Sequence, residues 1–190
     1  MAEFLLELLS EEIPARMQAR ASDDLRRLVA EKLTEAGLGF GKADAYATPR
    51  RLALHIEGLP ARQPDREIEV KGPRVGAPEN VLQSFLKARG LASLDACEQR
   101  ESGRGAFWFY VERVAGRPTG EVLAGILPAT IAGIPWPKSM RWAHDRQSWV
   151  RPLRNIAAVL DGALVPFELE LGSPAHSHRI AARNETFGHR

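Results

Sequence analysis

The stretch Ile156-Ala-Ala-Val-Leu-Asp-Gly-Ala-Leu-Val-Pro-Phe-Glu-Leu-Glu-Leu171 decides the fold class of this 190-residue chain. Two largely apolar runs, 156–160 and 163–171, flank the dipeptide Asp161-Gly162. Asp-Gly is favoured in the two-residue turn of a β-hairpin, because both central positions of that turn require a positive φ. The stretch therefore predicts two antiparallel strands joined by a tight turn.

Further strands are expected on both sides of this hairpin. Short apolar or alternating patterns predict strands at 3–9, 52–57 and 67–71, the last ending at Gly72-Pro73. A second hairpin is predicted to join 95–101 to 106–114. Strands linked in this way pair mainly antiparallel.

Three helices are predicted between these strands, each beginning near a proline, which the first helical turn tolerates. They run from Pro14 to Ala36, from Pro78 to Gly90, and from Pro118 through Leu127. In the second helix four apolar side chains are expected to face inward: Val81, Leu82, Phe85 and Leu86. Mixed helices with mainly antiparallel, hairpin-linked strands indicate an α+β fold rather than a doubly wound parallel sheet. We expect one large domain over residues 1–190, with a subdivision near 115–135 as the alternative.

Composition places few limits on function. Hydrophobic residues make up 44% of the chain and charged residues 26%, as in ordinary globular proteins. A formal net charge of +2 is too small to indicate nucleic-acid binding, so such a function depends on where the charges lie. The single cysteine, Cys97, excludes an internal disulfide and is typical of a reducing compartment. With no apolar stretch near the ~20 residues that span a bilayer, we expect a soluble, cytoplasmic protein without a membrane partner.

Residues 135–154 combine aromatic rings with cations. Three tryptophans alternate there with five cations and one acid: Trp136, Trp142 and Trp149; Lys138, Arg141, Arg146, Arg151 and Arg154; and Asp145. In one interpretation the cations contact phosphates while the rings stack on bases or pack beneath guanidinium groups. In the other, the tryptophans anchor the core and the arginines form a solvated rim.

No catalytic pattern is found. The chain has no glycine-rich phosphate loop, no Gly-x-Ser-x-Gly turn and no metal-binding His-Glu-x-x-His helix. We therefore predict neither a catalytic residue nor a metal site in this chain.

Six short motifs, in order along the chain, resemble those of the bacterial glycyl-tRNA synthetase beta subunit. They are Leu5–Ala15, Ala47–Ala53, Lys71–Pro73, Pro137–Trp142, Val150–Arg154 and Thr186–Arg190. The resemblance implies the N-terminal region of a longer beta subunit, cut at its C-terminal end. It also implies a fold similar to the editing-type domain of the phenylalanyl-tRNA synthetase beta subunit.

The same resemblance implies a function and partners. The family enzyme attaches glycine to tRNA(Gly) as a heterotetramer of two alpha and two beta subunits. ATP, Mg²⁺ and the aminoacylation site belong to the alpha subunit, so no cofactor and no activity are expected of this region alone. We expect it to bind tRNA and to organise the subunits, with a second beta subunit as a further partner. The alternative is a purely structural module that docks the alpha subunit or other beta domains.

The expected tRNA-binding residues lie mainly in these motifs. They are Arg50, Arg51, Lys71, Lys138, Arg141, Trp142, Arg151, Arg154, His189 and Arg190. If a strand begins directly after Pro49, Arg50 and Arg51 point to opposite faces. One of them can then face solvent, while the other must be paired or reach a ligand.

Overall fold

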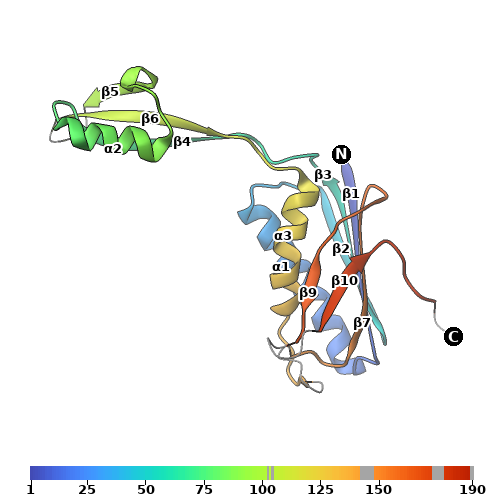
Figure 1. Cartoon of the computed structure of the whole chain (residues 1–190). Coiled ribbons are helices and arrows are strands. Elements are labelled where there is room, and N and C mark those ends of the chain that lie inside the picture. Colours follow the sequence, from blue (N-terminus) through green and yellow to red (C-terminus); the bar gives the residue numbers. More distant parts are fainter. Residues whose placement is uncertain (102, 104, 142–147, 173–177, 189–190) are drawn as a thin grey trace. The chain divides into compact units, whose positions relative to one another are not determined.

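The computed structural model describes residues 1–101, 103, 105–141, 148–172 and 178–188, which form two compact units (Figure 1). Unit 1 contains Met1–Gln63 and Arg117–Arg190, and unit 2 contains Pro64–Gly116. The boundaries between the units fall after Gln63 and after Gly116, and the domain division expected from the sequence stays a prediction. No helix in the described part of the chain is long and apolar enough to cross a membrane.

In the described residues, unit 1 is built on a seven-stranded sheet. Its strand order is β2-β3-β1-β7-β10-β9, and β8 pairs with β7. Neighbouring strands are antiparallel except β10 and β7, which run parallel. The strands are β1 (Ala2–Ser10), β2 (Lys42–Thr48), β3 (Arg51–Leu59), β7 (Leu153–Leu160), β8 (Ala163–Leu164), β9 (Glu168–Glu170) and β10 (Arg179–Arg183).

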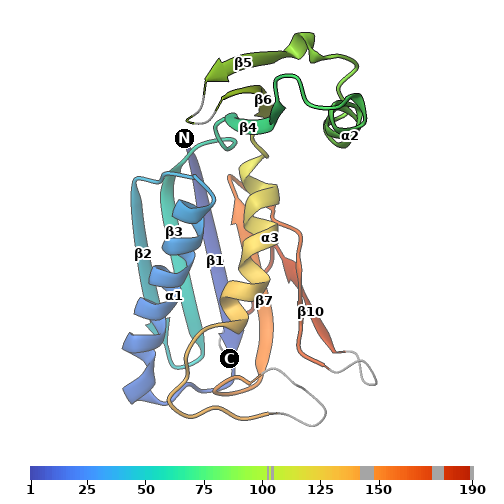
Figure 2. The same cartoon turned by 90° about the vertical axis from the view of Figure 1, so that its left-hand side faces the viewer.

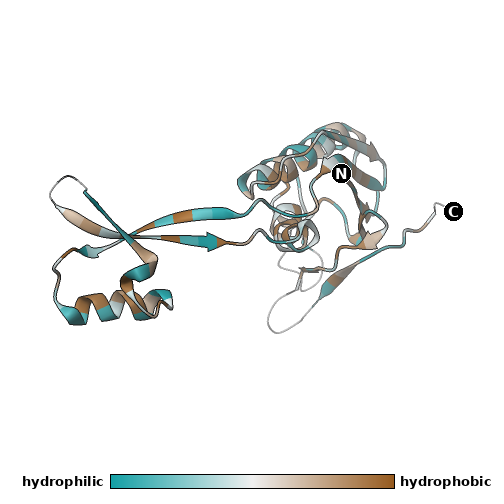
Figure 3. Cartoon of the chain, turned by 90° about the horizontal axis from the view of Figure 1, so that it is seen from above, coloured by the Kyte–Doolittle hydropathy of each residue, from teal (hydrophilic) through white to brown (hydrophobic). Residues whose placement is uncertain are grey.

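Two helices, α1 (Ala15–Glu35) and α3 (Thr119–Ala132), lie on one face of this sheet (Figure 2). α1 follows Pro14, whose fixed φ suits a helix start, and the chain leaves it through Gly37 at φ 73°. Hydrophobic and hydrophilic residues both occur along α1 (Figure 3), as expected of a helix with one buried side. Its buried apolar residues are Met17, Ala21, Leu25, Val29 and Leu33.

The sheet face beneath the helices supplies the rest of the core. On β1, Phe4, Leu6 and Leu8 are at most 1% exposed, because every second side chain of a strand points to the same face. The corresponding side chains of β3 are fully buried: Leu52, Leu54 and Ile56. Each such side chain contributes about 1.5–3 kcal/mol through removal from water.

The opposite face of this sheet is called the outer face, and the side chains at the odd positions of β1 and at positions 51, 53, 55 and 57 of β3 lie on it. The last described segment crosses it. The side-chain amide of Asn155, on β7, donates to the carbonyl of Glu185 at 2.9 Å. The hydroxyl of Thr186 donates to Glu7 of β1, and Arg51 of β3 donates to the carbonyl of Phe187. Residues 185–187, called the strap, therefore cross three adjacent strands.

The strap covers only one end of the outer face. Leu9 and Leu5 lie on the same strand and the same face, yet Leu9 is 8% exposed and Leu5 is 47% exposed. Phe187 of the strap and Leu9 line the same cavity, which places the strap beside Leu9. The other end of the outer face lies open in the described structure.

Unit 2 is a three-stranded antiparallel sheet with a helix. The strand order is β4 (Arg66–Arg74), β6 (Ala106–Val114) and β5 (Cys97–Glu101). Between β4 and β5 lie α2 (Glu79–Arg89) and the short helix η1 (Leu94–Ala96). Unit 2 follows Gln63 in the chain and ends just before Arg117. These two residues of unit 1 are hydrogen-bonded, since the N–H of Gln63 donates to the carbonyl of Arg117 at 2.9 Å, and this junction is called the closed point.

The predicted α+β fold with mainly antiparallel strands is confirmed. All three predicted helices and both predicted hairpins are present. Asp161 and Gly162 have φ values of 47° and 80°, as the predicted turn requires. The likeness to an editing-type domain of the phenylalanyl-tRNA synthetase beta subunit stays a prediction.

Several details differ from the predictions. Residues 163–171 do not form one strand: they divide into β8 and β9 around Pro166, which has no N–H to donate, and β9 pairs with β10 instead of β7. β2 and β10 were not anticipated. β4 continues through Gly72-Pro73 with a register shift, and Val81 of α2 is exposed rather than inward.

Candidate nucleic-acid interface

Several of the predicted tRNA-binding residues gather at one edge of unit 1. β1 ends where β3 and β7 begin, because β1 pairs antiparallel with both. This register brings Arg50, Arg51 and Arg154 next to two carboxylates, Glu7 of β1 and Glu11 in the segment after it.

Glu11 joins two of these arginines. Arg154 donates from Nε to Glu11 Oε1 at 2.7 Å, and Arg50 Nη2 lies 3.4 Å from Glu11 Oε2. The hydrogen bond from Arg154 is the largest effect on the pKa of Glu11 and lowers it. The charges of Arg154 and Arg50 lower this pKa further, whereas desolvation raises it, and the net pKa is below the ordinary value. A phosphate would therefore have to compete with an ionised carboxylate for these guanidinium groups.

Arg51 is held by different groups. Its Nε lies 3.2 Å from Glu7 Oε1, and its Nη2 donates to the strap at Phe187. Both Arg50 and Arg51 are thus paired with a carboxylate, and the condition under which they would point to opposite faces, a strand that begins directly after Pro49, is not met. β3 begins at Arg51, so Arg50 precedes the strand and the alternation of a strand does not apply to it.

Two tryptophans of the 135–154 stretch belong to the core. Trp136 and Trp149 pack edge to face, with ring centroids 5.1 Å apart, and Trp149 is 3% exposed. Their indole N–H groups are buried without a hydrogen-bond partner among the described residues. For these two rings the core-anchor interpretation is correct. Trp142 lies outside the described residues.

The described cations Lys138, Arg141 and Arg151 lie near a backbone pairing between Met140 and Trp149, called the closure. Met140 and Trp149 exchange two backbone hydrogen bonds of 2.8 and 3.1 Å, so the segment between them begins and ends at one point. Arg151 lies against this closure: its Nη1 donates to the carbonyl of Val150 at 2.9 Å and lies 3.3 Å from Met140 Sδ.

Lys138 and Arg141 lie next to the same closure in the sequence, just before and just after Met140, and both are exposed. Among the described residues, no carboxylate pairs with either of them or with Arg151. These three are the predicted cations that remain available to a phosphate.

The other predicted residues are not brought together with this group. Lys71 is on β4 of unit 2, where its ammonium lies 3.8 Å from the centre of the Phe107 ring. His189 and Arg190 lie outside the described residues. The proposed sites thus divide between the two units and the undescribed C-terminal residues.

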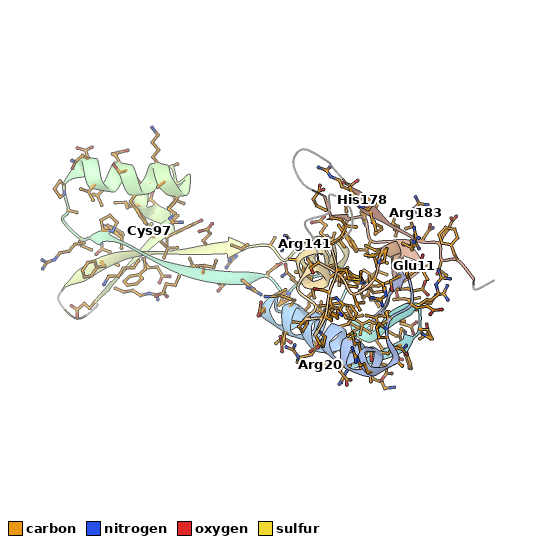
Figure 4. All side chains as sticks on the ribbon, turned by 90° about the horizontal axis from the view of Figure 1, so that it is seen from below. Glu11, Arg20, Cys97, Arg141, His178 and Arg183 are labelled. Carbon is orange, nitrogen blue, oxygen red and sulfur yellow. The ribbon has the colours of Figure 1, made fainter. Side chains whose placement is uncertain are left out.

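A cavity of about 440 Å³ adjoins the Glu11–Arg154 pair and was missed in the sequence. Arg154, His178, Arg179 and Arg183 line it, together with apolar side chains that include Trp149. In Figure 4 the labelled side chains of Glu11, His178 and Arg183 lie on the same side of unit 1. The sequence signal that could have predicted β10, and with it this cavity, is the alternation in Arg179-Ile-Ala-Ala-Arg183. This signal is weak because alanine has a low preference for strands.

The cations of this cavity differ in their pairing. Arg179 is bonded to Glu170 at 2.5 Å, and Glu168 lies 3.5 Å from it. Arg183 is exposed and has no carboxylate partner in the part of the chain that is described. Arg183 therefore adds a fourth candidate phosphate contact to Lys138, Arg141 and Arg151. No three His, Cys, Asp or Glu side chains of the described residues gather closely enough to hold a metal ion.

Comparison with known proteins connects this arrangement to a family. A family model described as glycyl-tRNA synthetase beta subunit matches residues 4–190. The glycine–tRNA ligase beta subunit of Rhodospirillum centenum is 47% identical over 206 residues, covering 100% of this chain and 29% of that protein. The corresponding proteins of Paracoccus denitrificans and Phenylobacterium zucineum are each 47% identical, over 97% and 98% of this chain and 28% of their own lengths. The chain thus spans less than a third of the length of these curated relatives.

Proposed function

The chain belongs to the glycyl-tRNA synthetase beta subunit family, and from this membership we propose that it is a tRNA-binding and subunit-organising region of a glycine–tRNA ligase. In this proposal a separate alpha subunit binds glycine, ATP and Mg²⁺ and carries out the aminoacylation. This chain contributes contacts to tRNA(Gly), and two alpha and two beta subunits form a heterotetramer that works in the cytoplasm.

The observation that carries the tRNA-binding part is the group of cations around the Met140–Trp149 closure. Lys138, Arg141 and Arg151 have no carboxylate partner among the described residues. Phosphate contacts by such cations supply much of the affinity of proteins for nucleic acids, because each contact releases counterions. Trp149 anchors this group, because its side chain is buried in the core and its backbone is hydrogen-bonded to Met140. Lys138, Arg141 and Arg151 are therefore attached close to a residue of the core.

The competing proposal is a structural module that docks the alpha subunit or other beta domains. The observation that favours it is the pairing of Arg50, Arg51 and Arg154 with Glu7 and Glu11, which reduces the positive charge at that edge. The two functions differ in their dependence on salt. Phosphate contacts weaken steeply as the salt concentration rises, whereas a protein interface anchored by apolar residues does not.

The deciding experiment measures the affinity of tRNA(Gly) for the full-length ligase at a series of salt concentrations. We expect Lys138→Ala, Arg141→Ala and Arg151→Ala each to weaken binding and to reduce the salt slope by about one unit per lost contact. Arg154→Ala should change the slope less, because Glu11 already neutralises that guanidinium. The control is Arg26→Ala, an exposed cation of α1 paired with Asp23.

Unchanged affinity and slope in the first three variants would overturn the tRNA-binding proposal and leave the structural module in its place. A separate measurement tests the division of labour. The 190-residue chain alone should support no glycine-dependent ATP–pyrophosphate exchange, and exchange should appear when the alpha subunit is present. Exchange by the chain in the absence of the alpha subunit would contradict the assignment of the chemistry to that subunit.

A further inference from the structure

The end of the outer face that the strap leaves open carries a group of apolar side chains from five strands. Leu5 of β1 lies opposite Val159 of β7, which lies opposite Leu164 of β8. Tyr46 of β2 and Ala53 of β3 form a second apolar pair, in the adjacent row nearer the strap, where Glu7 lies opposite Ala53. Leu5, Tyr46 and Leu164 are 47%, 58% and 42% exposed. These five residues are called the apolar patch.

The rim of the apolar patch is acidic. On the side away from the strap its charged side chains are Glu3, Asp44, Glu57, Asp161 and Lys42, that is, four carboxylates and one ammonium. Lys42 is paired with Asp44 at 2.6 Å, which leaves three carboxylates in excess. His55 lies between Glu3 and Glu57, 3.8 and 3.6 Å from their carboxylates.

This charge pattern discriminates among the surfaces that could cover the patch. The phosphates of an RNA would meet excess carboxylates, and so would a second copy of the same patch, because a symmetric pairing places like rims together. An apolar protein surface bordered by lysine and arginine side chains is complementary in both respects. The occupant is therefore a different protein surface with a basic rim.

The strap indicates which polypeptide supplies that surface. Residues 185–187 already lie on the outer face, bonded to β7, β1 and β3. The curated relatives are more than three times as long as the part that this chain matches. Polypeptide that continues from the strap starts at this face, so its effective concentration there is high. We propose that in the full-length beta subunit the polypeptide following this region covers the apolar patch with an apolar surface bordered by cations.

The test measures the accessibility of position 46 to a maleimide reagent. Tyr46→Cys is made in a Cys97→Ala background, in both the 190-residue chain and the full-length beta subunit, and the label is quantified by mass spectrometry of the peptide. We expect labelling in the full-length protein to slow by at least about tenfold, as for a residue reached only through rare opening. Ala19→Cys, on the exposed side of α1, is the matched control and should label equally in both proteins.

Each outcome is decisive. Equal labelling of position 46 in both proteins, or equal slowing of positions 46 and 19, overturns the proposal. Protection that appears only when the alpha subunit is added makes that subunit the occupant, and protection that requires tRNA makes it an RNA; both overturn the proposal. The test uses no tRNA otherwise, so its failure is separate from failure of the tRNA-binding function.

A charge reversal tests the rim. Glu57→Lys places a cation against the proposed basic border and should restore labelling of position 46 in the full-length protein. Glu57→Gln removes the attraction without adding repulsion, so its effect should be smaller. Neither change should alter labelling in the 190-residue chain. Labelling of the full-length protein that is insensitive to both changes overturns the electrostatic part of the proposal.

Discussion

Arg154 donates a hydrogen bond from Nε to Glu11 Oε1 at 2.7 Å and so ties the start of β7 to the segment that follows β1. Because this bond lowers the pKa of Glu11, the folded chain holds the Glu11 proton less tightly than the unfolded chain does. Glu11 therefore stabilises the folded chain when the pH is above the ordinary glutamate pKa of about 4.3. This stabilisation is lost as the pH falls through the lowered pKa of the folded chain. NMR titration of the Glu11 carboxyl should show its pKa rising toward the ordinary value in Arg154→Ala. An unchanged pKa in that variant would mean that Arg154 is not the cause.

The two adjacent arginines should differ in their importance for stability. Arg51→Ala removes contacts to Glu7 and to the strap, and we expect it to lower the free energy of unfolding by about 1–3 kcal/mol. Arg50→Ala removes two long contacts of 3.4 Å each, to Glu11 Oε2 and to the carbonyl of Ser10, and should cost about 1 kcal/mol or less. Urea unfolding of the 190-residue chain measures both. Equal losses in the two variants would show that the strap contact adds nothing to Arg51.

Trp149 should behave as a core residue rather than as a base-stacking ring. Trp149→Ala is expected to lower the free energy of unfolding by about 3–5 kcal/mol, because it leaves a cavity beside Trp136. Trp149→Phe should cost less, since it keeps an aromatic ring and removes an indole N–H that has no partner among the described residues. Met140→Ala is the control, because its side chain is exposed. A stable Trp149→Ala protein with weakened tRNA binding would contradict this assignment.

Leu9 and Leu5 provide a test of the strap. Leu9→Ala should cost about 2–5 kcal/mol, the range for truncation of a buried leucine, whereas Leu5→Ala in the 190-residue chain should cost much less. The two residues share a strand and a face, so differences in strand propensity do not enter. Similar costs for both would mean that the strap does not cover Leu9 in solution.

The sequence predicted the elements whose signals are local. Asp161-Gly162 specifies a turn through its own backbone preferences, and the period of the apolar residues in 15–35 specifies a buried helix side. β2 and β10 were not predicted because their local signals are weak: Lys42–Thr48 and Arg179–Arg183 contain few β-branched residues. They become strands because β3 and β7 offer unpaired edges, which is a tertiary effect.

The candidate site was predictable only in part. The sequence showed that cations and aromatic rings alternate in 135–154, but it could not show the partners of these cations. Glu11 and Arg154 are 143 residues apart and meet only because β1 and β7 are neighbours. Likewise, Trp149 and Arg151 are two residues apart, yet one is buried in the core and the other lies against the loop closure.

The closed point between Gln63 and Arg117 has an evolutionary consequence. Four hydrogen bonds hold it: Gln63 N–H to Arg117 O, Arg117 N–H to Gln63 Oε1, Thr119 N–H to Ala61 O and Thr119 Oγ1–H to Pro60 O. All of the bonded atoms belong to unit 1, so they would remain if a tight turn replaced residues 64–116. Homologous chains can therefore gain, lose or lengthen an insertion here while the sheet of unit 1 keeps its register. Length variation among relatives should concentrate at this position.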